Sequence, residues 1–212
     1  MTERQAVEHW KGDFGNAYTL RNESTEQSLA SRGRLFTRIL AATGLAPRSS
    51  VLEVGTNIGM NLVALGRLAT VSRFGVDVNA SALARLRAEP ELKTALVARA
   101  QGERLPFRTA AFDLVFTCGV LIHVPPDDLP EVAAEIVRVS ARYIVCAEYF
   151  SPRSEEIEYR GHRGLLFKRD FGGLFLDRWS KLRLLDYGFL WKRVEFDDLT
   201  WWAFEKPAPD YR

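Results

Sequence analysis

A glycine-containing turn flanked by acidic residues is the part of this sequence best suited to binding a nucleoside. The apolar run at 51–55 includes Glu53 and ends at Gly55, and Gly59 precedes a segment with helical periodicity. In an open α/β sheet, ligands bind beyond the carboxyl ends of the strands, where glycine lets the backbone approach closely. Asp77 ends the next apolar run, 18 residues after Gly59, where a carboxylate can accept hydrogen bonds from ribose hydroxyls.

The residues around this turn narrow the choice of ligand. A glycine-rich turn alone would equally suit a tight structural turn. Met60 stands where dinucleotide-binding sequences carry their third glycine, which argues against a dehydrogenase. Glu53 would repel a pyrophosphate at the helix N-terminus but would favour an amino acid that carries a sulfonium. The sequence therefore predicts a ligand that combines adenosine with a charged methionine.

Alternating apolar and helical segments predict the scaffold that holds this turn. Five apolar runs alternate with helical or turn-forming segments, at 51–55, 74–78, 95–98, 112–118 and 143–149. This pattern indicates a parallel sheet with helices on both faces. Two further strand-like runs, at 182–190 and 200–204, have only a charged turn between them, which predicts an antiparallel hairpin. We therefore expect a Rossmann-like α/β fold with a mostly parallel seven-stranded sheet and a C-terminal antiparallel hairpin.

The N-terminal region is predicted to add a helix to this sheet. Ser24 and Gln27 have the spacing of a helix-capping box, and the apolar periodicity that follows stops at Gly44. We expect a single domain over residues 1–212, with a lid and the first helix in 1–45 and the sheet core in 50–206.

Four stretches resemble, in order and spacing, the successive motifs of class I S-adenosylmethionine-dependent methyltransferases. They are residues 51–55, 74–78, 103–107 and 111–115. A narrower resemblance, to the methylases associated with pseudaminic acid biosynthesis, extends over nearly the whole chain. It rests on residues 10–15, 56–61, 119–123, 159–162, 167–171 and 186–189, with Tyr18, Arg21 and Asn22. Ancestry does not fix the substrate, so the acceptor must be argued from the site.

The resemblance implies S-adenosylmethionine as the cofactor and S-adenosylhomocysteine as its product. Glu53, Gly55 and Gly59 match the cofactor motif, and Asp77 matches the ribose-binding acid. The other residues that we assign to the cofactor site are Tyr18, Thr56, Asn57, Val78, Gln101, Gly102 and Cys118.

Gln101 departs from the common family pattern. It stands where an aspartate is often found near the adenine amine. Because Gln101 offers a carbonyl in place of a carboxylate, the adenine contact could equally come from the backbone at Gly102 or Glu103.

Three residues are candidates for proton transfer. His123 follows the fourth strand, where it could act as a general base or simply cap the loop before two prolines. Glu148 ends the fifth strand and could face the ligand crevice or form a structural salt bridge. His162 could bind or deprotonate the acceptor, or lie exposed in a loop.

The acceptor site is predicted from aromatic and basic residues outside the cofactor motifs. Trp10, Phe14 and Tyr18 recur at helical spacing, which suits either core packing or a lid that excludes water. Basic residues gather in the segment after the fifth strand, where they could clamp a carboxylate or phosphate or form a solvated face. Besides Trp10 and Phe14, the residues that we assign to the acceptor are Tyr149, Tyr159, Arg160, Lys168 and Arg169.

These residues favour methyl transfer to a small molecule. The resemblance implies a sugar acid or nucleotide-sugar-like acceptor. A small natural product is the alternative, and an accessory protein that binds the cofactor without catalysis belongs to a different class.

Composition excludes several other kinds of partner. The 29 basic and 27 acidic residues give no net field that would favour nucleic acid or a membrane surface. No apolar run approaches the roughly 18 residues of a membrane span, so we expect a cytoplasmic protein. We further expect a monomer or a homodimer. Cys118 and Cys146 lie in apolar runs, and no residues have metal-ligand spacing. We therefore expect neither a disulfide nor a metal.

Overall fold

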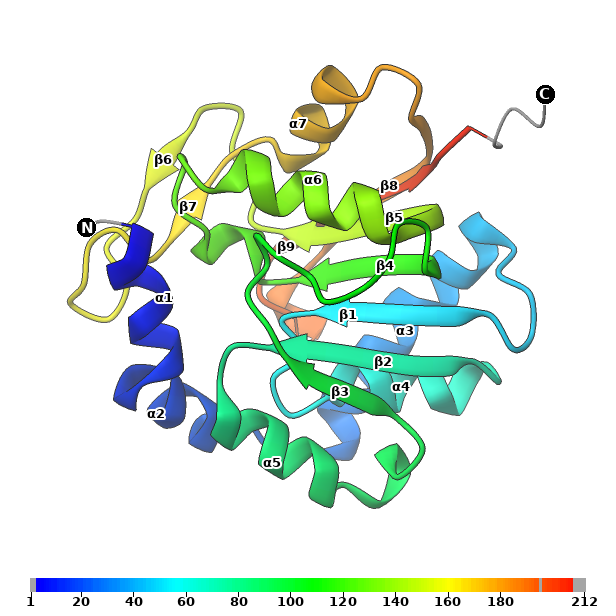
Figure 1. Ribbon diagram of the computed structural model, residues 1–212, viewed down its shortest axis with the longest axis horizontal. Coiled ribbons are helices and arrows are strands. Elements are labelled where there is room, and N and C mark those ends of the chain that lie inside the picture. The colour runs from blue at the N-terminus through cyan, green and yellow to red at the C-terminus, as the bar shows by residue number, and fades with distance from the viewer. Residues whose placement is uncertain (1–2, 195, 208–212) are drawn as a thin grey trace.

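The computed structural model describes residues 3–194 and 196–207. The strands of the main sheet follow the order β3-β2-β1-β4-β5-β9-β8 (Figure 1). Their bounds are β1 (Ser50–Val54), β2 (Ser72–Asp77), β3 (Leu96–Arg99), β4 (Phe112–Cys118), β5 (Ser140–Glu148), β8 (Arg183–Leu190) and β9 (Leu199–Glu205). Strands β1 to β5 are parallel, β9 is antiparallel to β5, and β8 is antiparallel to β9. The mostly parallel seven-stranded sheet with a closing hairpin is confirmed, and only β9 opposes the common direction.

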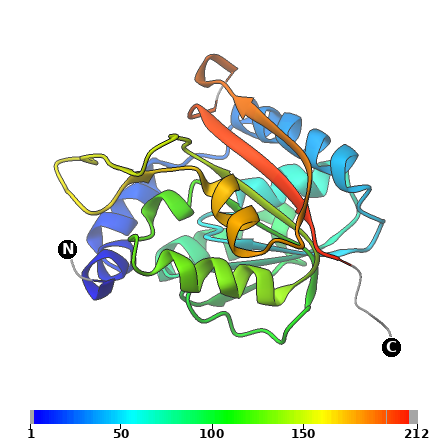
Figure 2. The same ribbon diagram turned by 90° about the horizontal axis from the view of Figure 1, so that it is seen from above.

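Helices cover both faces of this sheet (Figures 1 and 2). Their bounds are α1 (Glu3–Lys11), α2 (Asp13–Arg21), α3 (Glu26–Thr43), α4 (Met60–Leu68), α5 (Ala80–Ala88), α6 (Leu129–Val139) and α7 (Phe171–Arg178), with short 3-10 turns η1 (Pro90–Leu92), η2 (Leu121–His123) and η3 (Lys192–Val194). Helices α3, α4 and α5 pack on one face, and α6 and α7 pack on the other. The domain was predicted to span residues 1–212. Of these, residues 1, 2, 195 and 208–212 lie outside the described part of the chain.

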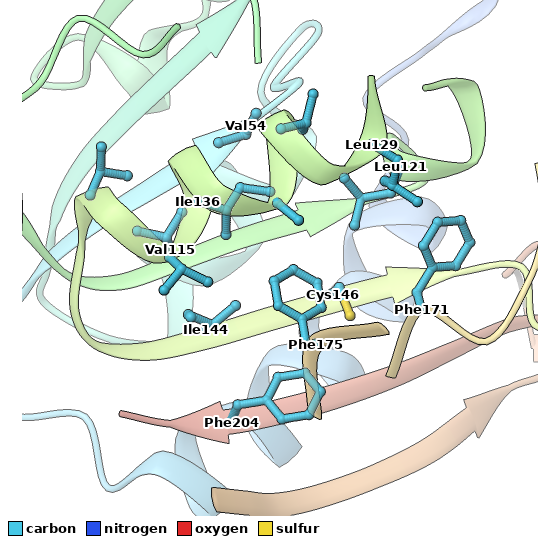
Figure 3. Packing of buried hydrophobic residues seen from close by; sticks show 14 of the residues in the cluster. Val54, Val115, Leu121, Leu129, Ile136, Ile144, Cys146, Phe171, Phe175 and Phe204 are labelled. Carbon is cyan, nitrogen blue, oxygen red and sulfur yellow. The ribbon is translucent and has the colours of Figure 1, made fainter. Parts of the chain in front are cut away.

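Neighbouring residues of each strand enter opposite halves of the core, because side chains alternate along a strand. In β4, Leu114 packs with Phe36 of α3, whereas Val115 belongs to the cluster under α6 and α7. Figure 3 shows Ile136 of α6 and Phe175 of α7 in that second cluster. The two clusters fix the sheet between its helices, and its strand ends then carry the site.

The N-terminal segment differs from the expected single helical face. Gly12 lies between α1 and α2 with a non-helical backbone, so Trp10 and Phe14 belong to different helices. The prediction that Ser24 caps this helix is wrong. Thr25 is the N-cap residue of α3, and its hydroxyl accepts a hydrogen bond from the backbone N–H of Ser28. The predicted end at Gly44 is confirmed, where φ is 59°.

A small hairpin interrupts the segment between β5 and α7. Its strands are β6 (Glu155–Glu156) and β7 (Phe167–Lys168), which pair antiparallel. At the tip, Tyr159 and His162 exchange two backbone hydrogen bonds around Arg160 and Gly161, which both have positive φ. This tip lies beside α1 (Figure 1).

No helix within the described residues is long and apolar enough to cross a membrane.

Candidate active site

A pocket lies at the carboxyl ends of β1, β2 and β4, beneath the N-terminal helices. Its lining combines the turn after β1, the end of β2, the segment after β3 and side chains from α1, α2 and α3. The predicted cofactor residues that line it are Tyr18, Glu53, Gly55, Thr56, Asn57, Asp77, Val78, Gly102 and Cys118. Tertiary structure thus brings together residues that lie as far apart in the sequence as Tyr18 and Cys118.

Two residues assigned to the cofactor do not line this pocket. Gln101 is exposed and forms an isolated backbone bridge with Arg104, so its side chain lies outside this pocket. Gly59 is the N-cap residue before α4 and has φ of 82°, and a Cβ there would come within 2.4 Å of the Leu92 side chain. Gly59 therefore serves close packing and a left-handed turn, not direct lining.

Asp77 is held by the backbone. Its Oδ2 accepts a 2.8 Å hydrogen bond from the N–H of Asn57, and its Oδ1 accepts another of 2.8 Å from the N–H of Asn79. Burial raises the pKa of Asp77, and these N–H donors oppose that effect. The carboxylate is thereby fixed at the end of β2 with its remaining lone pairs available for hydroxyl donors.

Glu53 is almost fully buried, with 1% exposure, on β1. Asn61 donates to its Oε1 at 2.7 Å, and the Thr56 hydroxyl donates to its Oε2 at 2.8 Å. Burial raises its pKa to about 8, although both hydrogen bonds and the positive charge of Arg32 lower it. This site therefore favours a cation that would stabilise the ionised carboxylate.

Four polar atoms in the lining are buried without a hydrogen-bond partner among the described residues. They are Trp10 Nε1, Arg32 Nε, Asn61 Oδ1 and Glu103 Oε2. Buried polar atoms normally have partners, because an unsatisfied one costs about 1–3 kcal/mol. These two donors and two acceptors fit a ligand that is polar at several points, as a nucleoside joined to an amino acid is.

His123 lies in η2 and lines the pocket. Its Nδ1 is 2.6 Å from the carbonyl oxygen of Leu165, which can only accept, so Nδ1 carries the proton of the neutral ring. Burial lowers the pKa of His123 to about 4. The ring is therefore neutral near pH 7, and its Nε2 is the nitrogen that can accept a proton.

Glu148 does not have the catalytic position expected from the sequence. Its carboxylate is fully buried and accepts hydrogen bonds from the Thr117 hydroxyl and from the N–H groups of Val120 and Ile122. Burial raises its pKa to about 7, and these donors oppose that effect. Glu148 does not line the pocket, and the hydrogen bonds that it accepts from Val120 and Ile122 hold the loop that carries His123.

Aromatic rings from α1, α2 and the β6–β7 hairpin form an aromatic lid, defined here as Trp10, Phe14, Tyr18 and Tyr159. Within it, Trp10 lies 5.2 Å from Phe14 and 5.4 Å from Tyr18, and Phe14 lies 6.1 Å from Tyr159, between ring centroids. The His123 ring is 4.5 Å from that of Trp10. Trp10 and Tyr18 line the pocket, whereas Phe14 and Tyr159 support them from outside.

Polar contacts attach this lid to α5. The amide of Asn79 donates to the Trp10 carbonyl and to the Asn16 side chain, each at 3.0 Å. Arg85 donates to the carbonyl oxygens of Thr19 and Asn22. Specific hydrogen bonds from Asn79 and Arg85 therefore hold the N-terminal helices against α5.

None of the remaining acceptor candidates lines the pocket, and two of them are exposed to solvent. His162 is exposed and meets the Phe14 ring edge to face, with 5.5 Å between ring centroids, so the structure places it outside the pocket. Arg160 is likewise exposed at the hairpin tip, with its guanidinium 5.4 Å from the Tyr159 ring. Neither side chain reaches the pocket lining.

Residues nearer β5 are better enclosed, although they do not line the pocket either. The Lys168 ammonium lies 5.5 Å from the ring centre of Tyr149. Burial raises the pKa of Tyr149, and Tyr18 and Tyr159 are close enough to add to that effect. Arg169 is partly buried, and its Nε and Nη2 have no hydrogen-bond partner among the described residues. Arg169 is thus the member of the basic cluster best suited to an anion.

Polar residues of the lining that were not predicted from the sequence include Arg32, Asn61, Asn79 and Glu103. Asn61 and Asn79 look like ordinary helix-start residues in sequence, and Arg32 sits in an amphipathic helix with no local signal. Glu103 was considered only for its backbone. The described residues contain no group of three or more His, Cys, Asp or Glu that could hold a metal ion.

Residues 51–142 match the family model described as a methyltransferase domain. An uncharacterized protein of Haemophilus influenzae is 30% identical over 105 residues, which span 48% of this chain and 42% of that protein. The chain thus matches less than half the length of this curated relative.

Two solved structures show the fold. A 1,6-didemethyltoxoflavin-N1-methyltransferase of Burkholderia thailandensis, with 1,6-didemethyltoxoflavin and S-adenosylhomocysteine bound, has a TM-score of 0.74 at 14% identity, covering 97% of this chain and 91% of its own. A magnesium protoporphyrin IX methyltransferase of Synechocystis with bound S-adenosylhomocysteine has a TM-score of 0.70 at 12% identity, covering 97% and 100%. This chain has the fold of class I S-adenosylmethionine-dependent methyltransferases.

Proposed function

We propose that this protein transfers a methyl group from S-adenosylmethionine to a small-molecule acceptor. The observation that carries the proposal is the set of polar groups around one pocket. Asp77 at the end of β2 offers an acceptor to the ribose. Glu103 after β3 offers one to the adenine amine, and Glu53 on β1 offers one to the ammonium group. The matched methyltransferase domain contains all three.

Each part of the cofactor has a distinct set of partners in this assignment. Asp77 accepts hydrogen bonds from the ribose hydroxyls, because its contacts with backbone N–H groups fix its carboxylate at the end of β2. The unsatisfied Oε2 of Glu103 accepts from the adenine amine, the role expected of Gln101. Glu53 and the turn at Gly55 bind the methionine part, because a buried carboxylate favours its ammonium.

Bound S-adenosylmethionine supplies an electrophilic methyl group on a sulfonium. The chain itself contributes position and proton transfer. The aromatic lid excludes water from the reacting groups. The enclosed pocket also holds the acceptor close to the methyl group. The Nε2 atom of His123 accepts the proton of a hydroxyl or amine acceptor, while Leu165 fixes the ring through Nδ1.

We propose a sugar acid or nucleotide-sugar-like metabolite as the acceptor. Arg169 supports this choice, since its buried N–H donors lack partners among the described residues and would suit a carboxylate or phosphate. Lys168, the neighbour of Arg169 in sequence, adds a second positive charge, and its ammonium lies 5.5 Å from the Tyr149 ring centre. A heteroaromatic natural product is the second candidate, favoured by the aromatic lid and by the fold shared with the didemethyltoxoflavin enzyme.

Calorimetry tests the cofactor. S-adenosylhomocysteine should bind with micromolar affinity, about −8 kcal/mol, and NAD should not bind. Tight NAD binding without binding of S-adenosylhomocysteine would reject the proposal.

Mass spectrometry tests the acceptor. Cell extract incubated with the protein and deuteromethyl-labelled S-adenosylmethionine should yield a labelled anionic metabolite. Arg169→Ala should lower kcat/KM for that metabolite roughly 10–100-fold, the loss expected for one charge-assisted contact. Arg160→Ala is the matched control, because Arg160 is exposed at the hairpin tip. Equal losses in both variants would contradict a specific anion contact at Arg169.

A further inference from the structure

Arg32 lines the pocket but has no role in the assignments above. Within residues 3–194 and 196–207, it is the one lysine or arginine of the lining, whereas Glu53, Asp77 and Glu103 contribute carboxylates. Its Nη1 donates to the Ser28 carbonyl at 3.1 Å, one turn earlier on α3. Its Nε–H is buried without a hydrogen-bond partner in the same part of the chain. A buried charged donor without a partner is energetically costly, so we expect a bound ligand to supply its acceptor.

The surroundings of Arg32 are those of an amino-acid site. Its positive charge lowers the pKa of Glu53 and of Cys118, which places all three side chains in one neighbourhood. Arg32 nevertheless makes no ion pair within 4.0 Å to any carboxylate of the described chain. Asn61 donates to Glu53 through Nδ2, and its Oδ1 is buried without a partner among the described residues. One cationic donor therefore stands near two acceptors.

We propose that Arg32 binds the carboxylate of the methionine part of S-adenosylmethionine, while Glu53 and Asn61 accept hydrogen bonds from its ammonium group. An amino-acid zwitterion carries its ammonium and its carboxylate on the same carbon, so a site needs a donor and acceptors side by side. Arginine suits the donor role because its planar guanidinium matches a carboxylate and remains charged when partly buried. The assignment rests on the proposed function, since it presumes that this cofactor occupies the pocket.

A pair of ligands isolates the contact. Calorimetry should compare S-adenosylhomocysteine with its decarboxylated analogue, which keeps the ammonium but lacks the carboxylate, on the wild-type protein and on Arg32→Gln. The substitution should weaken S-adenosylhomocysteine roughly 10–100-fold, as for loss of one charge-assisted hydrogen bond, and the analogue less than about twofold. Arg38→Gln is the control, because it makes the same charge change on α3 at a residue outside the pocket lining.

The outcomes separate this inference from the proposed function. Equal losses for the two ligands, or no loss for S-adenosylhomocysteine, would overturn the role of Arg32 while leaving the methyltransferase proposal intact. A wild-type protein that binds neither ligand would overturn both. If Arg32→Gln does not fold, Arg32→Lys gives the same comparison, because it keeps the charge but removes Nε–H. The preference for the carboxylate-bearing ligand must then fall at least several-fold, and an unchanged preference would overturn the assignment.

Discussion

Binding of S-adenosylhomocysteine should release a proton from Glu53. Burial raises the pKa of this carboxyl from its ordinary 4.5 to about 8, so at pH 7 about nine in ten molecules carry the proton. The ligand's ammonium favours the ionised form, and binding must therefore displace that proton. The expected release at pH 7 is close to one proton, and affinity should rise almost tenfold per pH unit from about pH 6 to 7.5.

The direction of the stability change follows from the same shift. An acid whose folded-state pKa is raised stabilises the folded protein fully below its unfolded pKa, and this contribution is lost as pH rises through the folded pKa. For Glu53 the window runs from 4.5 to about 8, and the shift corresponds to an energy on the order of 5 kcal/mol. Bound ligand should reduce the loss of stability in this window, because its ammonium stabilises ionised Glu53.

Calorimetry in two buffers measures the released proton directly. Tris and phosphate differ in ionisation enthalpy, so the difference in observed binding enthalpy gives the number of protons exchanged. Glu53→Gln is the matched control, since it keeps the size and one oxygen acceptor while removing the titrating group. A proton count that is the same in the wild type and in Glu53→Gln would refute the reasoning, because any contribution from the ligand's own amine is common to both.

Four substitutions give further expected outcomes. Asp77→Asn should weaken S-adenosylhomocysteine by about 1.5–3 kcal/mol in calorimetry, because a charged acceptor is lost; unchanged affinity removes Asp77 from the site. Glu103→Gln should weaken S-adenosylhomocysteine about tenfold more than the 6-oxo analogue that lacks the adenine amine, and equal effects would place the amine elsewhere. His123→Gln should lower kcat by roughly 10²–10⁴ with cofactor affinity unchanged, and an unaltered kcat would exclude it as the base. Glu148→Gln should lower the unfolding free energy by about 1–3 kcal/mol in chemical denaturation, because its amide cannot accept from every donor of the loop; unaltered stability would mean that the loop does not depend on this carboxylate.

Most of the scaffold could be predicted from the sequence because it depends on local periodicity. Continuous apolar runs such as 112–118 are typical of strands buried on both faces, and the structure confirms β4 over the same residues. The hairpin was predictable for a similar reason, since β8 and β9 are separated only by a short charged segment. The cofactor turn after β1 was found because a strand, a glycine and a helix follow one another directly along the chain.

Tertiary structure decided which side chains face the pocket. Gln101 and Glu103 are two residues apart, and only packing shows that Gln101 points to solvent while a Glu103 oxygen is buried at the pocket. Glu148 was expected to face the crevice, yet its carboxylate accepts hydrogen bonds from the backbone N–H groups of the loop at Val120.

Contacts between residues far apart in the sequence were the hardest feature to predict. The sequence by itself determined the strands, the helices and the turn that approaches the cofactor, since each depends on near neighbours. It carried no local signal that Arg32 of α3 lines the same pocket as Glu53, or that His123 is fixed by Leu165. Such contacts depend on how helices and loops close over the sheet, which is set by the packing of the whole chain.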